Sequence, residues 1–365
     1  MPCIRTCRPC VRPIISCASR RPSFLVHSAA PSILPFFMPP VLVAILSGLV
    51  AAYALLAGAA ALGFLAARRG SPPSAPAEWP SVTIVPVRDE DAGRLRDTVQ
   101  SCAYPTDRIA VARPDGPVPG DVTLTLPAAA DAPPTWPQSM VRQSRADAPV
   151  VMGPTLVEHD DLFLPRLEAL QHLGRLTLLG GAAHLGLPLG PGTANRALDA
   201  KSRPPGSTSP EASVPPAPLA PATAAFNPEP EAAVTRPPAD SFVDLLRNQA
   251  EWFRQAIRAP SRFVQAQAVG LWLVHAALLA CCAVALALPA WRQPTLLALL
   301  GKMGADVVLT LPAASHFGQR QLLRSTVATV LMLVLSIPLA GGWALVAPSR
   351  GRHAGRNAHN ETRAS

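Results

Sequence analysis

Residues 121 to 134 read DVTLTLPAAADAPP, and this stretch decides how the rest of the chain is interpreted. Apolar side chains at Val122, Leu124 and Leu126 alternate with threonines, which is the pattern of a half-buried β-strand. A proline ends the alternation, and a single acid, Asp131, follows. Ligands of α/β enzymes bind at the carboxyl ends of strands. The stretch therefore predicts a strand that ends at a candidate site for a metal–phosphate group.

The composition indicates a membrane protein. Of 365 residues, 49% are hydrophobic and 15% are charged, and the mean hydropathy is +0.24, which is too apolar for an ordinary soluble chain. The net charge is +9, yet residues 71 to 240 hold 13 basic and 19 acidic residues, a net of −6. The excess of basic residues therefore lies beside the apolar runs and at the two ends of the chain. This distribution favours a membrane over a nucleic-acid partner.

Four apolar stretches predict membrane helices. The first occupies residues 38 to 69 and the others lie within residues 268 to 347, each about 19 residues or longer. Arg68 and Arg69, at the end of the first stretch, predict that the following domain lies in the cytoplasm. We expect the chain to be an integral protein of the cell inner membrane. The third stretch contains Lys302 and Asp306 one helical turn apart, and we expect these two charges to pair.

Both ends of the chain are basic. Residues 1 to 37 form a Cys- and Arg-rich extension without an acid. It is typical of a transit peptide, but we favour a start codon placed too early, because Met38 directly precedes the first apolar run. With three trailing spans, the basic tail of residues 348 to 365 falls on the side of the membrane opposite to the domain, against the positive-inside rule.

Between the membrane stretches, strands alternate with helices, which predicts an α/β domain with a mostly parallel sheet. The domain is expected over residues 80 to 197, with helices at 135 to 146 and 162 to 179 among its elements. Residues 198 to 223 are rich in Pro, Ala and Ser and are expected to be disordered. Residues 224 to 262 complete the domain and add an interfacial helix with Ser241 as its cap.

Two motifs carry a resemblance. PSVTIVPVRDE at residues 80 to 90, followed by SCAYP, resembles the membrane-bound inverting glycosyltransferases of family two, and the similarity runs through the last span. It implies a truncated GT-A (Rossmann-like) nucleotide-sugar domain. In that family the first strand ends in a nucleotide-binding turn, occupied here by Pro86, Arg88 and Glu90, and a second strand ends in a base-binding acid, here Asp115. From the residues alone, a surface ion pair is an equal alternative for the turn.

The resemblance also implies a divalent cation, Mg²⁺ or Mn²⁺, held by a D-x-D motif that neutralises the leaving diphosphate. The matching residues are Ala129-Ala130-Asp131, so Asp131 is the only acid left to ligate the metal. The alternative for Asp131 is an ordinary solvated turn acid.

Two further family motifs are altered. The general base should fall between residues 195 and 226, where the only acids, Asp199 and Glu211, form no recognisable motif, so the catalytic residue is unknown. The Q-x-x-R-W motif of the interfacial helix, which contacts the acceptor, keeps Trp252 but has Glu251 in place of the arginine.

Two functions follow. The first is transfer of a sugar from a nucleotide-sugar donor to a lipid or glycan acceptor at the cytoplasmic face of the membrane, with impaired activity. The second is a non-catalytic scaffold, or pseudoenzyme, of the same family. The incomplete metal motif, the absent base and the altered interfacial helix favour a loss of activity. An unrelated small membrane protein is disfavoured, because the matching segments occur in family order.

Overall fold

The structure is a computed structural model that describes residues 40–70, 73–86, 95, 99–113, 118–127, 129–144, 148–191, 194–200 and 224–346. All of these belong to one compact unit, Met38–Ser365, and the other unit, Met1–Phe37, lies outside them. The expected basic extension and basic tail, and residues 201–223 of the Pro-rich segment, therefore lie outside the described residues.

The centre of the described unit is a six-stranded sheet with the order β2-β1-β3-β6-β4-β7. Its strands are β1 (Val82–Pro86), β2 (Ile109–Val111), β3 (Val122–Leu126), β4 (Val150–Met152), β6 (Arg196–Asp199) and β7 (Ala224–Phe226). A separate parallel pair consists of β5 (Thr155–Val157) and β8 (Val234–Arg236).

The α/β class is confirmed, and the sheet is mostly parallel as expected, except for one strand that runs in the opposite direction. β1 pairs in parallel with β2 and β3, and β4 with β7, whereas β6 runs antiparallel to both of its neighbours, β3 and β4. β6 has four residues, which is too short for a clear periodic pattern, and it was not predicted. The sheet is mixed because this strand enters its middle in the opposite direction.

The stretch that begins at Asp121 forms β3, a central strand with β1 on one side and β6 on the other. All five residues of β3 are buried, including Thr123 at 1% exposed and Thr125 at 7%. The expectation of a half-buried strand is therefore wrong, because both faces of β3 are covered. The hydroxyl of Thr125 donates to the carbonyl of Ala194, 2.5 Å away, which satisfies a polar group on the buried threonine face.

β6 also corrects a domain boundary. Residues 198 and 199 were expected in the disordered segment, but they belong to this strand, and Asp199 is the pairing partner of Val122 at the amino end of β3. Asp131 follows the carboxyl end of β3. At about 3.3 Å per residue, the length of β3 separates these ends by roughly 13 Å. Asp199 thus lies away from the edge at which a general base would be needed.

Helices cover both faces of the sheet. α3 (Trp136–Ser144) packs with Leu124 and Val151 in one cluster, and α4 (Phe163–His184) packs with Val150 and Met152 in another. The predicted helices at 135–146 and 162–179 are confirmed. α4 is longer than expected and buried on more than one side, because it lies between the sheet and the apolar helices.

Four described segments are long and apolar enough to cross a membrane: Pro40–Ala67, Arg262–Ala287, Pro289–His316 and Arg320–Val346. Their helices are α1 (Pro40–Ala67), α7 (Arg262–Ala287), α8 (Arg292–His316) and α9 (Thr326–Val346). The helix that the sequence places at the membrane interface is α6 (Phe242–Ile257), and its predicted cap is confirmed, because the Ser241 side chain accepts from the Asp244 N–H. Short 3-10 turns are η2 (Thr106–Arg108), η5 (Pro230–Ala232), η6 (Pro289–Trp291) and η7 (Arg320–Ser325).

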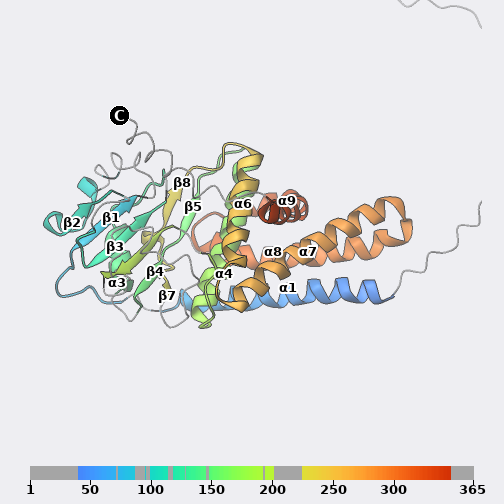
Figure 1. Ribbon diagram of the computed structural model, residues 1–365, viewed down its shortest axis with the longest axis horizontal. Coiled ribbons are helices and arrows are strands. Elements are labelled where there is room, and N and C mark those ends of the chain that lie inside the picture. Colours follow the sequence, from blue (N-terminus) through green and yellow to red (C-terminus); the bar gives the residue numbers. More distant parts are fainter. Residues whose placement is uncertain are drawn as a thin grey trace, which may run out of the picture. The chain divides into compact units, whose positions relative to one another are not determined.

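The four apolar helices do not all run in the same direction. α1, α7 and α8 extend away from the sheet in Figure 1, whereas α9 is seen nearly end-on and α4 and α6 lie between the sheet and the long helices. α9 packs against α6 and α7. Four helices of spanning length are confirmed, and the side of the membrane that the basic tail reaches stays a prediction.

Close packing and one hydrogen bond join α1 to its neighbours. A Cβ added at Gly63 of α1 would lie 2.8 Å from the carbonyl oxygen of Gly181 in α4, so this crossing requires glycine. Nearer the amino end of α1, the Tyr53 hydroxyl donates a hydrogen bond to Asp306 Oδ1, which is 2.5 Å away. Asp306 also forms the predicted ion pair with Lys302, whose side chain is fully buried. The predicted Lys302–Asp306 pair is confirmed.

Candidate functional site

The expected nucleotide-binding residues fall at one edge of the sheet. Pro86 ends β1 and pairs with Leu126, the last residue of β3, so both strands leave the sheet side by side. β2 is parallel to β1, and its carboxyl end lies at the same edge. Arg88, Glu90 and Asp115 themselves lie outside the described residues, and their roles stay predictions.

Asp131 belongs to no group of three or more potential metal-ligating side chains in the part of the chain that the structure describes, and its role as a metal ligand stays a prediction. Its backbone forms an isolated bridge with Thr235, with N···O distances of 2.7 and 2.9 Å, and its side chain is exposed. Among the described residues, no group of three or more His, Cys, Asp or Glu side chains is arranged to hold a metal ion. The described residues therefore do not fit the divalent cation that the resemblance implies.

Ala129, at the position of the missing first acid, has an unusual backbone. Its φ is +54°, in the left-handed region. Asp and Asn adopt this region several times more readily than other residues with a side chain. The backbone of this turn is therefore compatible with the acid that the sequence lacks.

Trp252 contacts an arginine on another helix. Glu251, which replaces the arginine, forms an ion pair of 2.5 Å with Arg254 on the same helix. The ring of Trp252 instead contacts Arg175 of α4, whose guanidinium carbon lies 5.3 Å from the ring centroid. A cation over an indole ring is a favourable contact. A guanidinium of α4 thus lies beside Trp252, whereas residue 251 of α6 is an acid.

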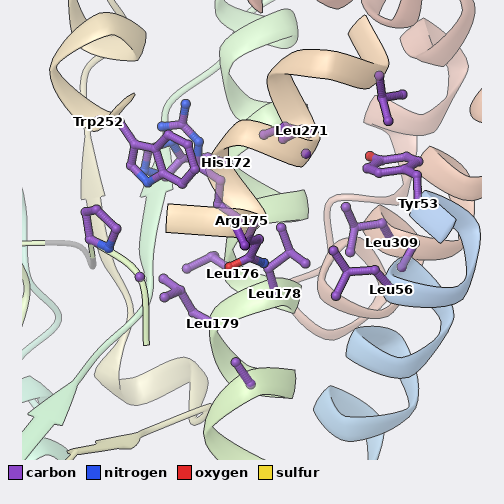
Figure 2. A pocket seen from close by; sticks show the side chains of 18 of the residues that line it. Tyr53, Leu56, His172, Arg175, Leu176, Leu178, Leu179, Trp252, Leu271 and Leu309 are labelled. Atoms are coloured by element: carbon purple, nitrogen blue, oxygen red, sulfur yellow. The ribbon is translucent and has the colours of Figure 1, made fainter. Parts of the chain in front are cut away.

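Trp252 and Arg175 line a cavity of about 410 Å³, within the range of about 300–1,000 Å³ that is usual for ligand sites. Figure 2 shows His172 and Trp252 on one side of the cavity, Tyr53 and Leu56 on the other, and leucines of α4 between them. Pro127, Thr155 and Arg236 bring the cavity to the ends of the strands, and residues of α1 and α7 line the remainder. The cavity therefore extends from the sheet edge to two helices of spanning length.

The charges around the cavity are not balanced. Glu168, whose side chain is 3% exposed, pairs with Arg236 at 2.5 Å and accepts the Ala239 N–H at 2.6 Å. Arg175 has no carboxylate within 4.0 Å among the described residues. Burial, and then the charge of Arg236, lower the pKa of Arg175 to about 10, although Glu168 acts in the opposite direction.

His172 experiences the same excess of positive charge. It lies one helical turn before Arg175, and it lines the same cavity. Burial holds the pKa of His172 well below its ordinary value, and the charges of Arg236 and Arg175 lower it further. His172 is therefore a neutral imidazole at physiological pH, with one N–H to donate and one nitrogen to accept.

A smaller pocket of about 80 Å³ adjoins the cavity and shares Tyr53, Arg175 and Trp252 with it. Asp306 and His275 also line it. Asp306 is already bound by Lys302 and by the Tyr53 hydroxyl. The hydrogen bond between Tyr53 and Asp306 therefore links α1 to α8 beside the cavity.

Comparisons with known proteins do not establish a family. No protein-family model and no curated protein matches the chain. Among solved structures, the chain is similar to the mannosyltransferase PcManGT from Pyrobaculum calidifontis in complex with GDP-Man and Mn²⁺. The identity is 14% and the TM-score is 0.45, over 83% of this chain and 99% of that chain. A likeness at this level carries no argument about function.

The sequence did not lead us to predict a site at Arg175, His172 and the Arg236–Glu168 pair. One signal was available, since the stretch LEALQHLGRLTLL places a His and an Arg three residues apart in a leucine-rich helix. An arginine that is surrounded by leucines is seldom buried without a partner. The contact with Trp252 could not have been predicted, because it joins two helices that are far apart in the chain.

Proposed function

We propose that this chain is a glycosyltransferase-like membrane protein that transfers a sugar from a nucleotide-sugar donor to a lipid acceptor at the cytoplasmic face of the inner membrane, with impaired turnover. The observation that supports this proposal is that the cavity extends from the sheet to two apolar helices. One end reaches Pro127, directly after β3, and the other lies between α1 and α7. An enzyme that joins a soluble donor to a membrane acceptor needs such a connection. The apolar lining favours a lipid over a glycan, whose hydroxyls require many hydrogen-bond partners.

The donor is assigned to the sheet edge. The shared edge of β1, β2 and β3 supports this assignment, because ligands of α/β folds bind outside the carboxyl ends of such strands. Pro86, Arg88, Glu90 and Asp115 all occupy or follow these ends in the sequence. We therefore propose that the turns after β1 and β2 bind the nucleotide.

Impaired turnover is supported by the surroundings of Asp131. It is exposed on a backbone bridge, and the described residues offer no acid group that would complete a cation site. Asp199 lies at the opposite end of β3. No step of the proposed reaction is assigned to a metal or to a base.

The experiment is a donor-hydrolysis and transfer assay on the full chain in a neutral detergent, with a panel of nucleotide sugars and Mg²⁺ or Mn²⁺. We expect slow turnover that the Asp131→Ala variant reduces further. Asp107→Ala, which removes an exposed acid in η2, is the matched control. A wild-type protein with no turnover above a detergent blank for any donor would contradict the proposal.

The second candidate is a non-catalytic relative that binds the nucleotide without turnover. It is favoured by Glu251, which stands where the family motif has an arginine and pairs with Arg254 on the same helix. Calorimetric titration with nucleoside diphosphates separates the two candidates. Binding without hydrolysis supports the pseudoenzyme, and binding with Asp131-dependent hydrolysis supports the transferase.

A further inference from the structure

The cavity beside α4 contains a cation with no counter-charge in the described part of the chain. Arg175 has neither a carboxylate within 4.0 Å nor a hydrogen bond to another described side chain, and its guanidinium lies against the ring of Trp252. The nearby Glu168 is already occupied by Arg236 and by a backbone N–H. Two arginines and one glutamate leave a net charge of +1 at this end of the cavity.

A charge in an apolar cavity is costly unless it is neutralised. The planar fork of an arginine matches the oxygens of a phosphate, with which it forms two parallel hydrogen bonds. The guanidinium carbon lies over the ring of Trp252, 5.3 Å from its centroid, and this cation–π contact supplies no negative charge. His172, one turn away and lining the same cavity, adds a further N–H.

The remaining lining is suited to a hydrocarbon chain. On α1 it runs from Leu49 to Ala57 and on α7 from Ala266 to Val274. At about 1.5 Å per residue, each helix contributes roughly 12 Å of wall. Both helices are apolar and of spanning length, so this part of the cavity belongs to the depth of the lipid tails.

We propose that the cavity binds a lipid with a phosphate head group, which Arg175 contacts while the hydrocarbon chain lies between α1 and α7. This inference rests on the proposed function and names the class of its acceptor. A neutral lipid would leave the charge of Arg175 uncompensated, and a free phosphate would leave the apolar part of the cavity empty. The site requires both parts in one molecule.

The test is equilibrium binding of radiolabelled dodecyl phosphate to the full chain in a neutral detergent. We expect unlabelled dodecyl phosphate to displace the probe, and dodecanol and inorganic phosphate to compete at least about tenfold less well. Equal competition by dodecanol would overturn the role of the phosphate. Equal competition by inorganic phosphate would overturn the role of the chain.

Variants test the two ends of the cavity separately. Arg175→Gln should weaken binding about tenfold or more, and Arg175→Lys, which keeps the charge, should weaken it less. Arg166→Gln is the matched control, because Arg166 lies on the same helix and pairs with the exposed Asp161. Unchanged binding by a folded Arg175→Gln protein would overturn the proposal.

A second pair of variants leaves Arg175 intact. Gly270 lines the cavity, and a Cβ added there meets no atom within 4 Å, so Gly270→Phe should fold and fill the space for the chain. Gly304→Phe is equally unobstructed but lies outside the cavity lining. We expect loss of binding only in Gly270→Phe, and equal binding by both variants would contradict the placement of the chain. Arg175-dependent binding in a protein that transfers no sugar would uphold this inference while the proposed function fails.

Discussion

The turn around Asp131 and the cavity around Arg175 lie close together, because Asp131 bridges to Thr235 and the next residue, Arg236, lines the cavity. The turn carries the family motif, yet its acid is exposed and the described residues form no cation site around it. The cavity carries no expected motif on α4, yet it holds a cation without a carboxylate partner in the described chain. A residue at a motif position is thus not necessarily arranged to bind a ligand, and a cavity suited to a ligand does not necessarily carry a family motif. Five substitutions test this difference between the turn and the cavity.

The largest effect is expected for Asp306→Ala, beside the cavity. This change removes the carboxylate that pairs with the fully buried Lys302, and breaking a buried pair from one side costs about 3–5 kcal/mol. Thermal unfolding in detergent measures the loss. The double variant Lys302→Met/Asp306→Leu should recover most of it, and a single variant as stable as the wild type would show that the pair does not support the cavity.

Glu168→Gln should have the next largest effect. It removes the buried partner of Arg236, and we expect a loss of about 1–3 kcal/mol in stability. The substitution also leaves Arg236 without a carboxylate partner, in addition to Arg175, so dodecyl phosphate should bind more tightly. Glu251→Gln, which breaks a half-exposed pair, should change stability by less than about 1 kcal/mol. Weaker binding of the phosphate lipid by Glu168→Gln would contradict the charge argument.

His172 should make the protein sensitive to acid. Its folded-state pKa is lowered by burial and by two arginines, so below pH 6.5 the unfolded chain takes up a proton that the folded chain does not. Stability is therefore lost as the pH falls, by about 1 kcal/mol at pH 5.5. The difference between the wild type and His172→Gln in unfolding between pH 7.5 and 5.5 isolates this contribution. The same pH slope in both proteins would show that His172 does not titrate in this way.

Ala129→Asp restores the first acid of the motif at a residue with φ of +54°. Because Asp tolerates this region better than Ala, we expect stability to be unchanged or higher by a few tenths of a kcal/mol. We also expect Mn²⁺ affinity, measured by electron paramagnetic resonance, to increase over that of the wild type. An insoluble variant would mean that the turn does not accept the carboxylate. A stable variant with no gain in affinity would mean that the edge is not a degenerate metal site.

The smallest effect on stability is expected for Asp131→Ala. The side chain is exposed and the bridge to Thr235 uses only backbone atoms, so the free energy of unfolding should change by less than about 0.5 kcal/mol. Chemical denaturation at several pH values provides the measurement. A loss above about 2 kcal/mol would reveal a structural role for this carboxylate.

Periodic stretches were predicted well, whereas the strand β6 was not predicted. The four apolar helices and α3, α4 and α6 follow from hydrophobic periodicity and from Ser241 as a cap, which are local properties. β6 was missed because four residues carry little pattern, and its direction depends on the distant strands β3 and β4. The residues in and beside the cavity were foreseen only where the signal is local. Trp252 and the Lys302–Asp306 pair were expected, but Arg175 and His172 required knowledge of which helices meet.

The sequence by itself determined that this protein has four helices of spanning length, an α/β domain and an incomplete set of family motifs. These are properties of neighbouring residues, so periodicity and composition suffice to predict them. Only the tertiary structure decided that β3 is buried on both faces, that Asp199 lies at its far end, and that Arg175 faces a cavity. The physical reason is that burial and charge neutralisation depend on residues brought together from distant parts of the chain. A cation on α4 is uncompensated only because α6, β8 and α1 surround it without offering a free acid among the described residues.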